Sequence, residues 1–474
     1  MHREDDRPGS TCDPLNSSAN PSSTPSTSSA SSSSHPAAAA PSGVVVTGAG
    51  GYIGGAIVSY LLEHTDVPRV HATVRGDVSS SRYAALRALD PSTPSSSRRR
   101  LHLYSADMAA PGAFDEACRH CSAVIHVAAP TSIRCRGAKR AQKVLIDPAI
   151  RGIENVVSSV EKMGLDTVVF TSSMSAVQGD GWERGKEHVY TEEDWNEVDT
   201  TPAENAYAFM KVCAERRCWN LYKKRDPGSS WKRLVVLCPG LVLGAPATDV
   251  RSELVLFMTD LMRGRVWPVI PNYFFSMVHL DDVARAHVLA CFPHGKNDGN
   301  DGNDGNGGNG GNGGNGGNDE TVPEATRLIL AAGDQTHGLK DVMCGPVKER
   351  LAAHLEARLG ERVKNGEGHR PRNGKRHRPC ARCTSYTSYT SYTSYTSYTS
   401  WFRWPMAEAP KWILRPLSWF MLSVQWPLVR AYVNKPGRLD GGKVVRQLPG
   451  FGSYRDPVDG CLDMLAWLVE HGRA

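Results

Sequence analysis

Apolar and polar positions follow each other along this chain in a pattern that predicts a parallel sheet covered by helices. From residue 43 onward, short runs of β-branched residues recur between longer stretches with apolar residues three and four positions apart. Short continuous apolar runs are typical of strands buried on both faces, and the longer spacing is typical of crossover helices. The predicted strands are Val44–Thr47, Val70–Val74, Leu101–Tyr104, Ala123–Val127, Thr167–Phe170 and Leu234–Leu237. The predicted fold class is therefore α/β, with a doubly wound parallel sheet.

Two stretches between these strands carry the clearest helical periodicity. Ile53, Ile57, Val58, Leu61 and Leu62 mark one apolar face directly after the first strand. A second amphipathic stretch runs from Ile146 through Met163. Their positions fit crossover connections between neighbouring parallel strands.

Other segments have compositions that cannot bury enough surface to offset chain entropy. Residues 1–42 are mostly Ser, Pro, Ala and Thr, and we expect a disordered arm. Residues 297–318 repeat Gly, Asn and Asp, and residues 384–398 are five tandem Thr-Ser-Tyr triplets within a longer low-complexity stretch, 361–400. We expect both to be disordered insertions at the surface.

The net charge of +6 does not indicate a nucleic-acid partner. Residues 361–383 contain eight Lys and Arg against two Glu, which accounts for the whole excess. We favour a solvated insertion over an acidic partner or a targeting address for this segment, and we predict no nucleic-acid binding.

No export signal is apparent at the start of the chain, so we expect a cytoplasmic protein. The twelve Cys are scattered, which favours reduced thiols, and neither Cys118 with Cys121 nor Cys380 with Cys383 predicts a metal site. Residues 412–429 are rich in Trp and Leu but are interrupted by Arg415 and two Pro, so they are too short to span a membrane. We favour the interpretation that this segment covers the substrate pocket, and we leave contact with a membrane surface open.

A glycine motif follows the first predicted strand and opens the first predicted helix. Its residues are Thr47-Gly48-Ala49-Gly50-Gly51-Tyr52-Ile53-Gly54. Gly48 permits a tight turn, Gly51 lets the backbone approach a phosphate, and Gly54 lets the helix pack closely on the sheet. The motif therefore predicts a dinucleotide site in a Rossmann fold.

A second motif pairs Tyr207 with Lys211 on a helix that we expect to begin near Glu204. Their spacing of four residues places both side chains on one helix face. The ammonium of Lys211 would stabilise the phenolate form of Tyr207, so the phenol could exchange a proton with a substrate oxygen. Ser173 follows the fifth predicted strand, where an open sheet presents groups to its ligand.

Several blocks resemble extended short-chain dehydrogenases/reductases, in particular dihydroflavonol reductases and cinnamoyl-CoA reductases. Besides the glycine motif, the blocks begin at Ala72, Ala106, Val124, Val169, Tyr207, Pro239 and Val278, and together they cover residues 43 to 292. The resemblance implies that Ser173, Tyr207 and Lys211 are catalytic. It also implies cofactor contacts from Gly48, Gly51, Tyr52, Ile53, Gly54, Arg75, Asp107, Met108, Ala128, Tyr207, Lys211, Pro239 and Val242. Met174 and Ser175 depart from the small residues that usually follow this serine, which leaves the substrate open.

Arg75 stands at the end of the second predicted strand, where NAD-specific enzymes place an acid for the ribose 2′-hydroxyl. A guanidinium there can bind a 2′-phosphate, and we expect Asp77 to lie beyond the contact. The predicted cofactor is therefore NADP, with NAD less favoured.

These observations predict an NADP-binding Rossmann domain over residues 43–245 and a smaller, mixed substrate-binding part over residues 246–474. The predicted activity is reduction of a small-molecule carbonyl, or oxidation of the alcohol, by hydride transfer. Three alternatives stay open: an enzyme like 3β-hydroxysteroid dehydrogenases that uses NAD, a dinucleotide-binding sensor without catalysis, and a nucleotide-sugar epimerase that retains its NAD.

Overall fold

The computed structural model describes most of residues 42–292 and the C-terminal residues 437–473, with short stretches between them. The described residues are 42–91, 99–130, 135, 137–180, 182–199, 201–250, 252–263, 269–270, 273–292, 323–332, 337–338, 342, 347, 349–351, 353–355, 357, 407–408, 435 and 437–473. They all belong to the compact unit of residues 40–474. The predicted disordered arm up to residue 41, both low-complexity insertions and the Trp-rich segment lie outside the described residues.

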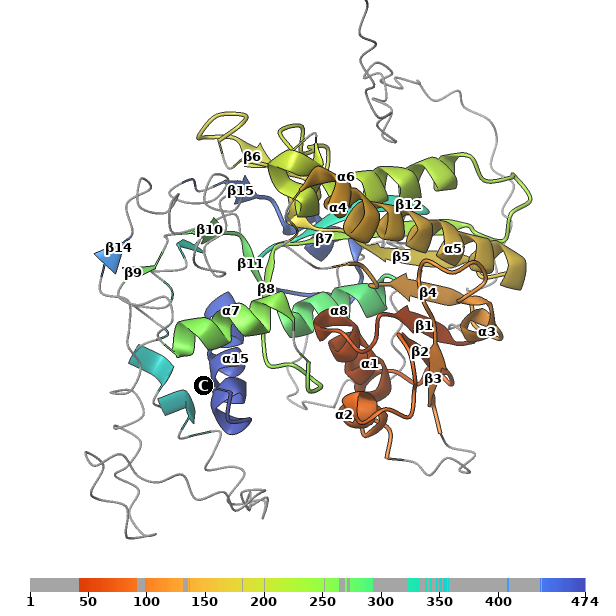
Figure 1. Ribbon diagram of the computed structural model, residues 1–474, viewed down its shortest axis with the longest axis horizontal. Helices are drawn as coiled ribbons and strands as arrows, with labels where there is room; N and C mark the ends of the chain where they lie inside the picture. The colour runs from red at the N-terminus through yellow and green to blue at the C-terminus, as the bar shows by residue number, and fades with distance from the viewer. Residues whose placement is uncertain are drawn as a thin grey trace, which may run out of the picture. The chain divides into compact units, whose positions relative to one another are not determined.

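A parallel seven-stranded sheet forms the centre of this unit, in the order β12-β7-β5-β4-β1-β2-β3 (Figure 1). Its strands are β1 (Val44–Thr47), β2 (Val70–Val74), β3 (Leu101–Ser105), β4 (Ala123–His126), β5 (Thr167–Thr171), β7 (Arg233–Pro239) and β12 (Ala325–Leu330). The chain moves outward from β1 to β3 and then returns to β4 on the other side of β1. This reversal places the carboxyl ends of β1 and β4 side by side, where open sheets bind their ligands.

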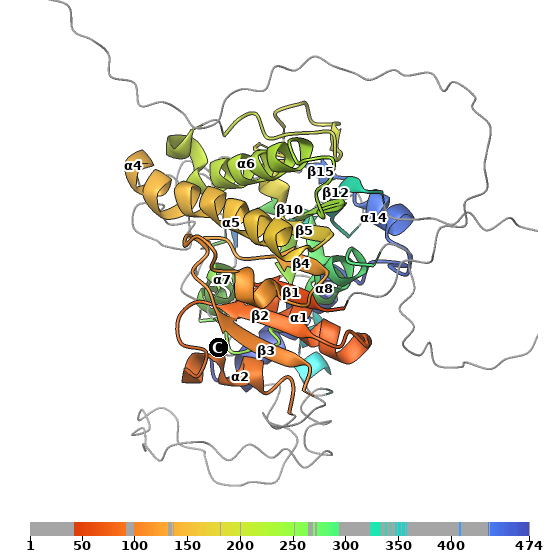
Figure 2. The ribbon, with the colours of Figure 1, turned by 90° about the vertical axis from the view of Figure 1, so that its right-hand side faces the viewer.

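Helices cover both faces of the sheet, as Figures 1 and 2 show. On one face α5 (Asp147–Met163) packs against α6 (Pro202–Lys223), and on the other α1 (Tyr52–His64) packs against α8 (Leu280–Leu289). The other helices are α2 (Ala84–Arg87), α3 (Asp115–Cys118), α4 (Ala138–Ala141), α7 (Glu253–Met262), α14 (Gly442–Gln447) and α15 (Pro457–Glu470), with a π-helical segment at Gln142–Ile146 and 3-10 turns at Ser81–Tyr83 and Met174–Ala176. The predicted doubly wound fold is confirmed.

The six strands predicted from the sequence are confirmed; β1 and β2 have the predicted ends, and the ends of the other four shift by one or two residues. The seventh strand, β12, was not predicted. It follows the Gly/Asn/Asp repeat and pairs with β7 from Ala325 opposite Leu234 to Leu330 opposite Pro239. The sheet therefore extends beyond residue 245, and the proposed domain boundary at that residue stays a prediction.

Small two-stranded pairings surround the carboxyl side of the sheet. They are β8 (Leu241–Leu243) with β11 (Met277–His279), β6 (Val189–Tyr190) with β15 (Arg438–Leu439), β9 (Val269–Ile270) with β14 (Ala407–Glu408), and β10 (Phe274–Phe275) with β13 (His337–Gly338). Two of these pairings join the C-terminal part of the chain to segments before residue 300. The second half of the chain thus folds back onto the first.

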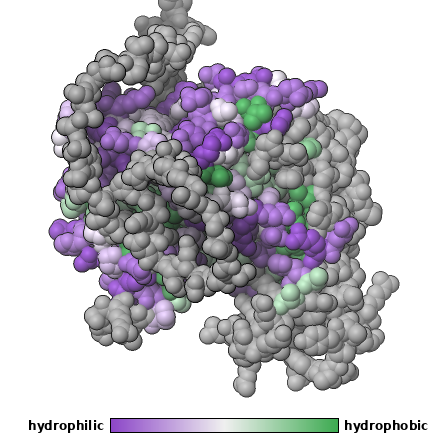
Figure 3. Space-filling view, turned by 180° about the vertical axis from the view of Figure 1, so that it is seen from behind, coloured by the Kyte–Doolittle hydropathy of each residue, from purple (hydrophilic) through white to green (hydrophobic). Residues whose placement is uncertain are grey.

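On the face seen in Figure 3, the coloured surface is mostly hydrophilic, and apolar residues form only small separate patches. Among described residues the exposed large hydrophobic side chains are Val144, Leu256 and Val445. None of the described helices combines the length and the apolar character that crossing a membrane requires.

Candidate active site

The glycine motif forms the turn between β1 and α1, and three of its positions have no room for a side chain. Gly48 has a φ of +68°, and a Cβ atom there would lie 2.9 Å from Ala128 Cα. A Cβ at Gly54 would lie 2.3 Å from the Gly48 carbonyl oxygen, and one at Gly50 would lie 2.6 Å from the Tyr83 ring. These contacts explain why only glycine fits, and they bring β1, β4 and α1 into close approach.

The start of α1 has the features of a phosphate-binding helix terminus. Its N-cap, Gly51, makes no side-chain cap hydrogen bond, and the first turn contains no acidic residue. The orphan amides and the positive end of the helix dipole are therefore left for an anion. The loop fits the pyrophosphate of a dinucleotide, as its sequence predicts.

Thr47 fixes the β4 end of this turn through its hydroxyl group. Its Oγ1 accepts hydrogen bonds from the amides of Val127 and Ala128, both at 3.1 Å. The same oxygen lies 2.8 Å from His126 Nδ1. Because the two amides occupy both lone pairs of the hydroxyl oxygen, the hydroxyl can only donate to His126, so Nδ1 is unprotonated.

The remaining predicted cofactor residues lie along the same edge of the sheet, with side chains in different environments. The Tyr52 hydroxyl donates to the Gly244 carbonyl at 2.7 Å. Asp107 is exposed and caps its own turn by accepting from Ala109 N at 3.0 Å. Met108 packs against Gly152 of α5. Ile53 packs at the edge of the core, Pro239 ends β7, and Val242 pairs with Val278.

Arg75 directly follows β2 and is exposed. Its carbonyl oxygen accepts a hydrogen bond from the Tyr83 hydroxyl at 2.8 Å, which holds the turn after β2 against the glycine loop. The Asp77 carboxylate accepts from the Ser79 hydroxyl at 2.7 Å and from the Ser79 amide at 2.8 Å. These bonds lower the pKa of Asp77 and direct its carboxylate into its own turn.

The three predicted catalytic residues lie at the carboxyl end of β5 and on the adjoining face of α6. Ser173 follows β5 and is almost fully buried, with its Oγ accepting from Ser175 N at 3.2 Å. Lys211 is buried, and its Nζ donates to the Thr171 carbonyl at 3.1 Å. The same nitrogen lies 6.0 Å from the centre of the Tyr207 ring. The ammonium is thus held between the strand that leads to Ser173 and the ring of Tyr207.

Two buried histidines near Lys211 are kept neutral. Burial, with the charge of Lys211 as a second cause, lowers the pKa of His126 to about 3. Burial also lowers the pKa of His287 to about 4. His287 Nε2 lies 2.8 Å from Thr171 Oγ1 while its Nδ1 lies 2.7 Å from the Val283 carbonyl. Neither ring adds a positive charge beside the Lys211 ammonium, which agrees with a structural role for His126.

The regular part of α6 begins at Ala206, two residues after Glu204, near which the sequence predicted the start of the helix. Asn205 has non-helical backbone angles, φ −151° and ψ 94°. Its side-chain Oδ1 accepts from Ala208 N at 3.2 Å, which is the geometry of an N-cap. Tyr207 therefore lies in the first turn of the capped helix.

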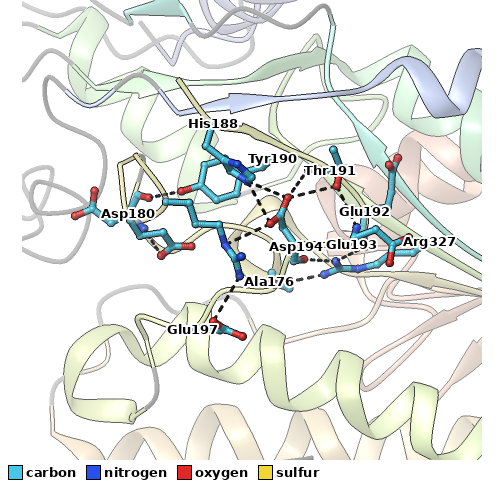
Figure 4. Close-up of polar contacts among 12 residues, drawn as sticks. Ala176, Asp180, His188, Tyr190, Thr191, Glu192, Glu193, Asp194, Glu197 and Arg327 are labelled. Carbon is cyan, nitrogen blue, oxygen red and sulfur yellow. Dashed lines mark hydrogen bonds and ion pairs between the residues drawn. The ribbon is translucent and has the colours of Figure 1, made fainter. Parts of the chain in front are cut away.

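Sequence reasoning missed a buried ion pair behind the catalytic residues. Arg327 of β12 and Glu215 of α6 are both buried, and Arg327 Nε lies 2.6 Å from Glu215 Oε1. Figure 4 shows Arg327 directed at the loop that carries Glu192 and Asp194. The sequence marks each residue separately, since Glu215 lies four residues after Lys211 and Arg327 stands directly before an apolar run, but neither signal identifies the other residue as its partner.

The cysteines correct one expectation. Cys213 of α6 is disulfide-bonded, so the prediction of a free thiol was wrong at this position. Cys118, Cys121, Cys135, Cys218, Cys238, Cys291 and Cys461 are free. Cys380 and Cys383 lie outside the described residues.

Comparison with known proteins assigns the family. The model of the NAD dependent epimerase/dehydratase family matches residues 44–300, which include the glycine motif and all three predicted catalytic residues. The chain belongs to this family. The predicted resemblance to extended short-chain dehydrogenases/reductases is confirmed.

Relatives within the family are named as reductases. The chain is 33% identical over 249 residues to cinnamoyl-CoA reductase CAD2 of Medicago truncatula, covering 52% of this chain and 71% of the relative. It is 30% identical over 256 residues to dihydroflavonol 4-reductase of Gerbera hybrida, covering 52% and 64%. It is also 30% identical over 251 residues to tetraketide alpha-pyrone reductase 2 of Arabidopsis thaliana, covering 52% and 73%. The chain is an NAD(P)-dependent oxidoreductase of this family.

Solved structures support the fold. Yeast methylglyoxal/isovaleraldehyde reductase, complexed with NADPH, superposes with a TM-score of 0.56 at 20% identity, covering 91% of this chain and 100% of that one. Vestitone reductase from alfalfa superposes with a TM-score of 0.53 at 19% identity, covering 91% and 99%. At this identity the likeness establishes the shared architecture alone.

Proposed function

We propose that this oxidoreductase reduces a carbonyl group of a small molecule with NADPH, or oxidises the corresponding alcohol, through Ser173, Tyr207 and Lys211. The observation that carries the proposal is the position of the Lys211 ammonium. It lies 3.1 Å from the Thr171 carbonyl and 6.0 Å from the Tyr207 ring centre, beside the strand end that leads to Ser173. A Ser, a Tyr and a Lys gathered at the ligand end of a dinucleotide-binding sheet fit carbonyl reduction.

Each residue would have a distinct task. The bound nicotinamide cofactor supplies a hydride to the carbonyl carbon. Tyr207 would donate its phenolic proton to the carbonyl oxygen, and the Lys211 ammonium would stabilise the phenolate that forms. Ser173 Oγ already accepts from Ser175 N, so its hydroxyl proton can be donated to the substrate oxygen.

NADPH is the proposed cofactor because of the charge at the end of β2. Arg75 is exposed beside the glycine loop, whereas the Asp77 carboxylate is occupied by Ser79. A guanidinium there favours a 2′-phosphate over a 2′-hydroxyl. The same choice is supported by two solved structures. The yeast reductase and Gre2 of Candida albicans are each in complex with NADPH.

The substrate class follows the named relatives and stays a proposal. Those relatives are named for cinnamoyl-CoA, dihydroflavonols and a tetraketide alpha-pyrone. We infer that the chain acts on a small carbonyl compound, with aromatic or polyketide-like compounds as the first candidates.

The test is NADPH oxidation with purified protein against a panel containing cinnamoyl-CoA, a dihydroflavonol, an α-pyrone, methylglyoxal and a steroid ketone. Tyr207→Phe should lower kcat by about 100-fold or more, because it removes the proton donor and little volume, while the Kd for NADPH stays within about twofold. Tyr222→Phe is the matched control, since its hydroxyl lies farther along α6 and donates to the Lys232 carbonyl. Turnover of Tyr207→Phe within about tenfold of the parent would refute the assignment.

A further inference from the structure

The buried ion pair between β12 and α6 lies next to the catalytic residues but is not part of the proposed chemistry. Arg327 is 6% exposed and Glu215 is 0% exposed. Arg327 contacts the carboxylate twice, with Nε 2.6 Å from Oε1 and Nη2 3.3 Å from Oε2. Parallel contacts of this kind fix the relative orientation of the two side chains as well as their distance.

All five N–H donors of Arg327 have acceptors. Nη1 donates to the Glu192 carbonyl at 2.9 Å and to the Asp194 carbonyl at 2.5 Å, and Nη2 also lies 3.3 Å from the Ala176 carbonyl. The guanidinium carbon lies 4.2 Å from the centre of the Trp195 ring. Arg327 therefore joins α6 to the turn after Ser173 and to the loop of residues 192–195, as Figure 4 shows for the loop. A lysine has three donors and no planar fork, so it could not make this set of contacts.

Glu215 completes the connection on the opposite side. Its Oε2 accepts from the Ser172 hydroxyl at 2.5 Å, and its Oε1 accepts from Trp219 Nε1 at 3.3 Å. Ser172 is the direct neighbour of Ser173. Glu215 lies four residues after Lys211 and eight after Tyr207, so the three residues share one face of α6. One carboxylate thus links the strand end that carries Ser173 to the helix that carries Tyr207 and Lys211.

Stability alone does not account for this arrangement. Removing two charges from water is costly, and replacing a buried ion pair by apolar residues of similar size is often neutral or stabilising. What such a pair provides is a single geometry, because every donor and acceptor must be satisfied at once.

We propose that Arg327 and Glu215 are positioning residues, which set the distance between Ser173 and the Tyr207–Lys211 face of α6. This inference rests on the proposed function. Catalysis by aligned groups is sensitive to their separation, and a displacement of about 1 Å can cost about 100-fold in rate. The ion pair should therefore affect kcat far more than it affects folding or cofactor binding.

The decisive variant replaces both charges, Glu215→Leu with Arg327→Met, so that no unpaired charge stays buried. We expect kcat to fall about 10- to 100-fold. It is measured with the most rapidly reduced compound of the panel and expressed per NADPH-binding site. The Kd for NADPH should change by less than about threefold, and the pH dependence of kcat should shift, because proton transfer from Tyr207 depends on the alignment. A double variant that binds NADPH and keeps kcat within about twofold of the parent would overturn the proposal.

Two further variants cover the case in which the double variant does not fold. Glu215→Gln keeps the shape of the side chain, and Arg327→Lys keeps the charge, and both should lower kcat with NADPH binding retained. An unchanged kcat in both would equally overturn the proposal. Arg217→Gln is the matched control. Arg217 lies on the same helix as Glu215, but it is partly exposed and pairs with Glu154 of α5 at 2.7 Å. If Tyr207→Phe retains its turnover, the proposed function fails. If Tyr207→Phe loses its turnover but the ion-pair variants retain theirs, only the positioning role fails.

Discussion

Arg75 is the residue on which the choice of cofactor depends. It is exposed at the end of β2, and the hydrogen bond from Tyr83 to its carbonyl holds the turn against the glycine loop. Because a charged hydrogen bond contributes about 1.5 to 3 kcal/mol, Arg75→Asp should weaken the binding of NADPH by about 10- to 100-fold and the binding of NADH much less.

Titration of both cofactors by fluorescence quenching measures this effect. Arg69→Asp, at the other end of β2, is the control for a general change in charge. Equal specificity constants for NADPH and NADH in the unmodified protein would contradict the assignment and favour the NAD-dependent alternative.

His126 gives a prediction about acid stability. Its pKa in the folded protein is about 3, well below the value near 6.5 of an unfolded chain. As pH falls below about 6.5, the unfolded state takes up a proton that the folded state excludes, so stability declines by up to about 1.4 kcal/mol per pH unit until the folded group titrates. Above about 6.5 this contribution is constant.

His126→Gln should make the loss of unfolding free energy between pH 6.5 and 4 less steep, by up to about 1.4 kcal/mol per pH unit. Urea unfolding at a series of pH values measures the slope, which is independent of any constant loss caused by the substitution. His64→Gln, at an exposed position on α1, is the control. Parallel slopes for the parent and His126→Gln would show that the buried imidazole titrates normally.

At the scale of elements, the cap of α6 controls where Tyr207 lies. Asn205 Oδ1 accepts from Ala208 N, and Tyr207 is in the turn that this bond closes. Asn205→Ala should lower the free energy of unfolding by about 1 kcal/mol, since an N-cap is worth about that much. It should also lower kcat, because the first turn of the helix is less ordered.

Asn205→Ser retains a capping oxygen and should recover most of both losses. Thermal unfolding and steady-state kinetics on the two variants separate the effects. Equal behaviour of the Ala and Ser variants would mean that the cap does not order this turn.

At the scale of the whole molecule, the Gly/Asn/Asp repeat separates α8 from the last strand of the sheet. β12 pairs along its full length with β7, and the Glu324 carbonyl accepts from Leu234 N at 2.8 Å. Deletion of residues 297–318 should change the melting temperature by no more than a few degrees, because shortening a long loop changes its closure entropy little.

The melting temperature and kcat of the deleted chain test this expectation. A cooperative loss of folding would mean that the repeat is required for β12 to reach β7. Deletion of the Thr-Ser-Tyr triplets, residues 384–398, provides a second insertion of low complexity for comparison.

The sequence by itself determined the features that are local. Short continuous apolar runs rich in β-branched residues are typical of strands buried on both faces, so six strands were predicted to within two residues. Gly48 and Gly54 were identified because a turn between a strand and a helix leaves no room for a Cβ atom there. The spacing of four between Tyr207 and Lys211 places both on one helix face whatever the rest of the fold does.

The tertiary structure alone decided what depends on contacts between distant segments. β12 is a short apolar run after a long insertion, and only its pairing with β7 identifies it as part of the sheet. Arg327 and Glu215 are 112 residues apart, and neither has a local pattern that reveals the other. Their charges are satisfied only where β12, α6 and the loop after β5 meet, because a buried charge requires partners that the folded chain alone brings together.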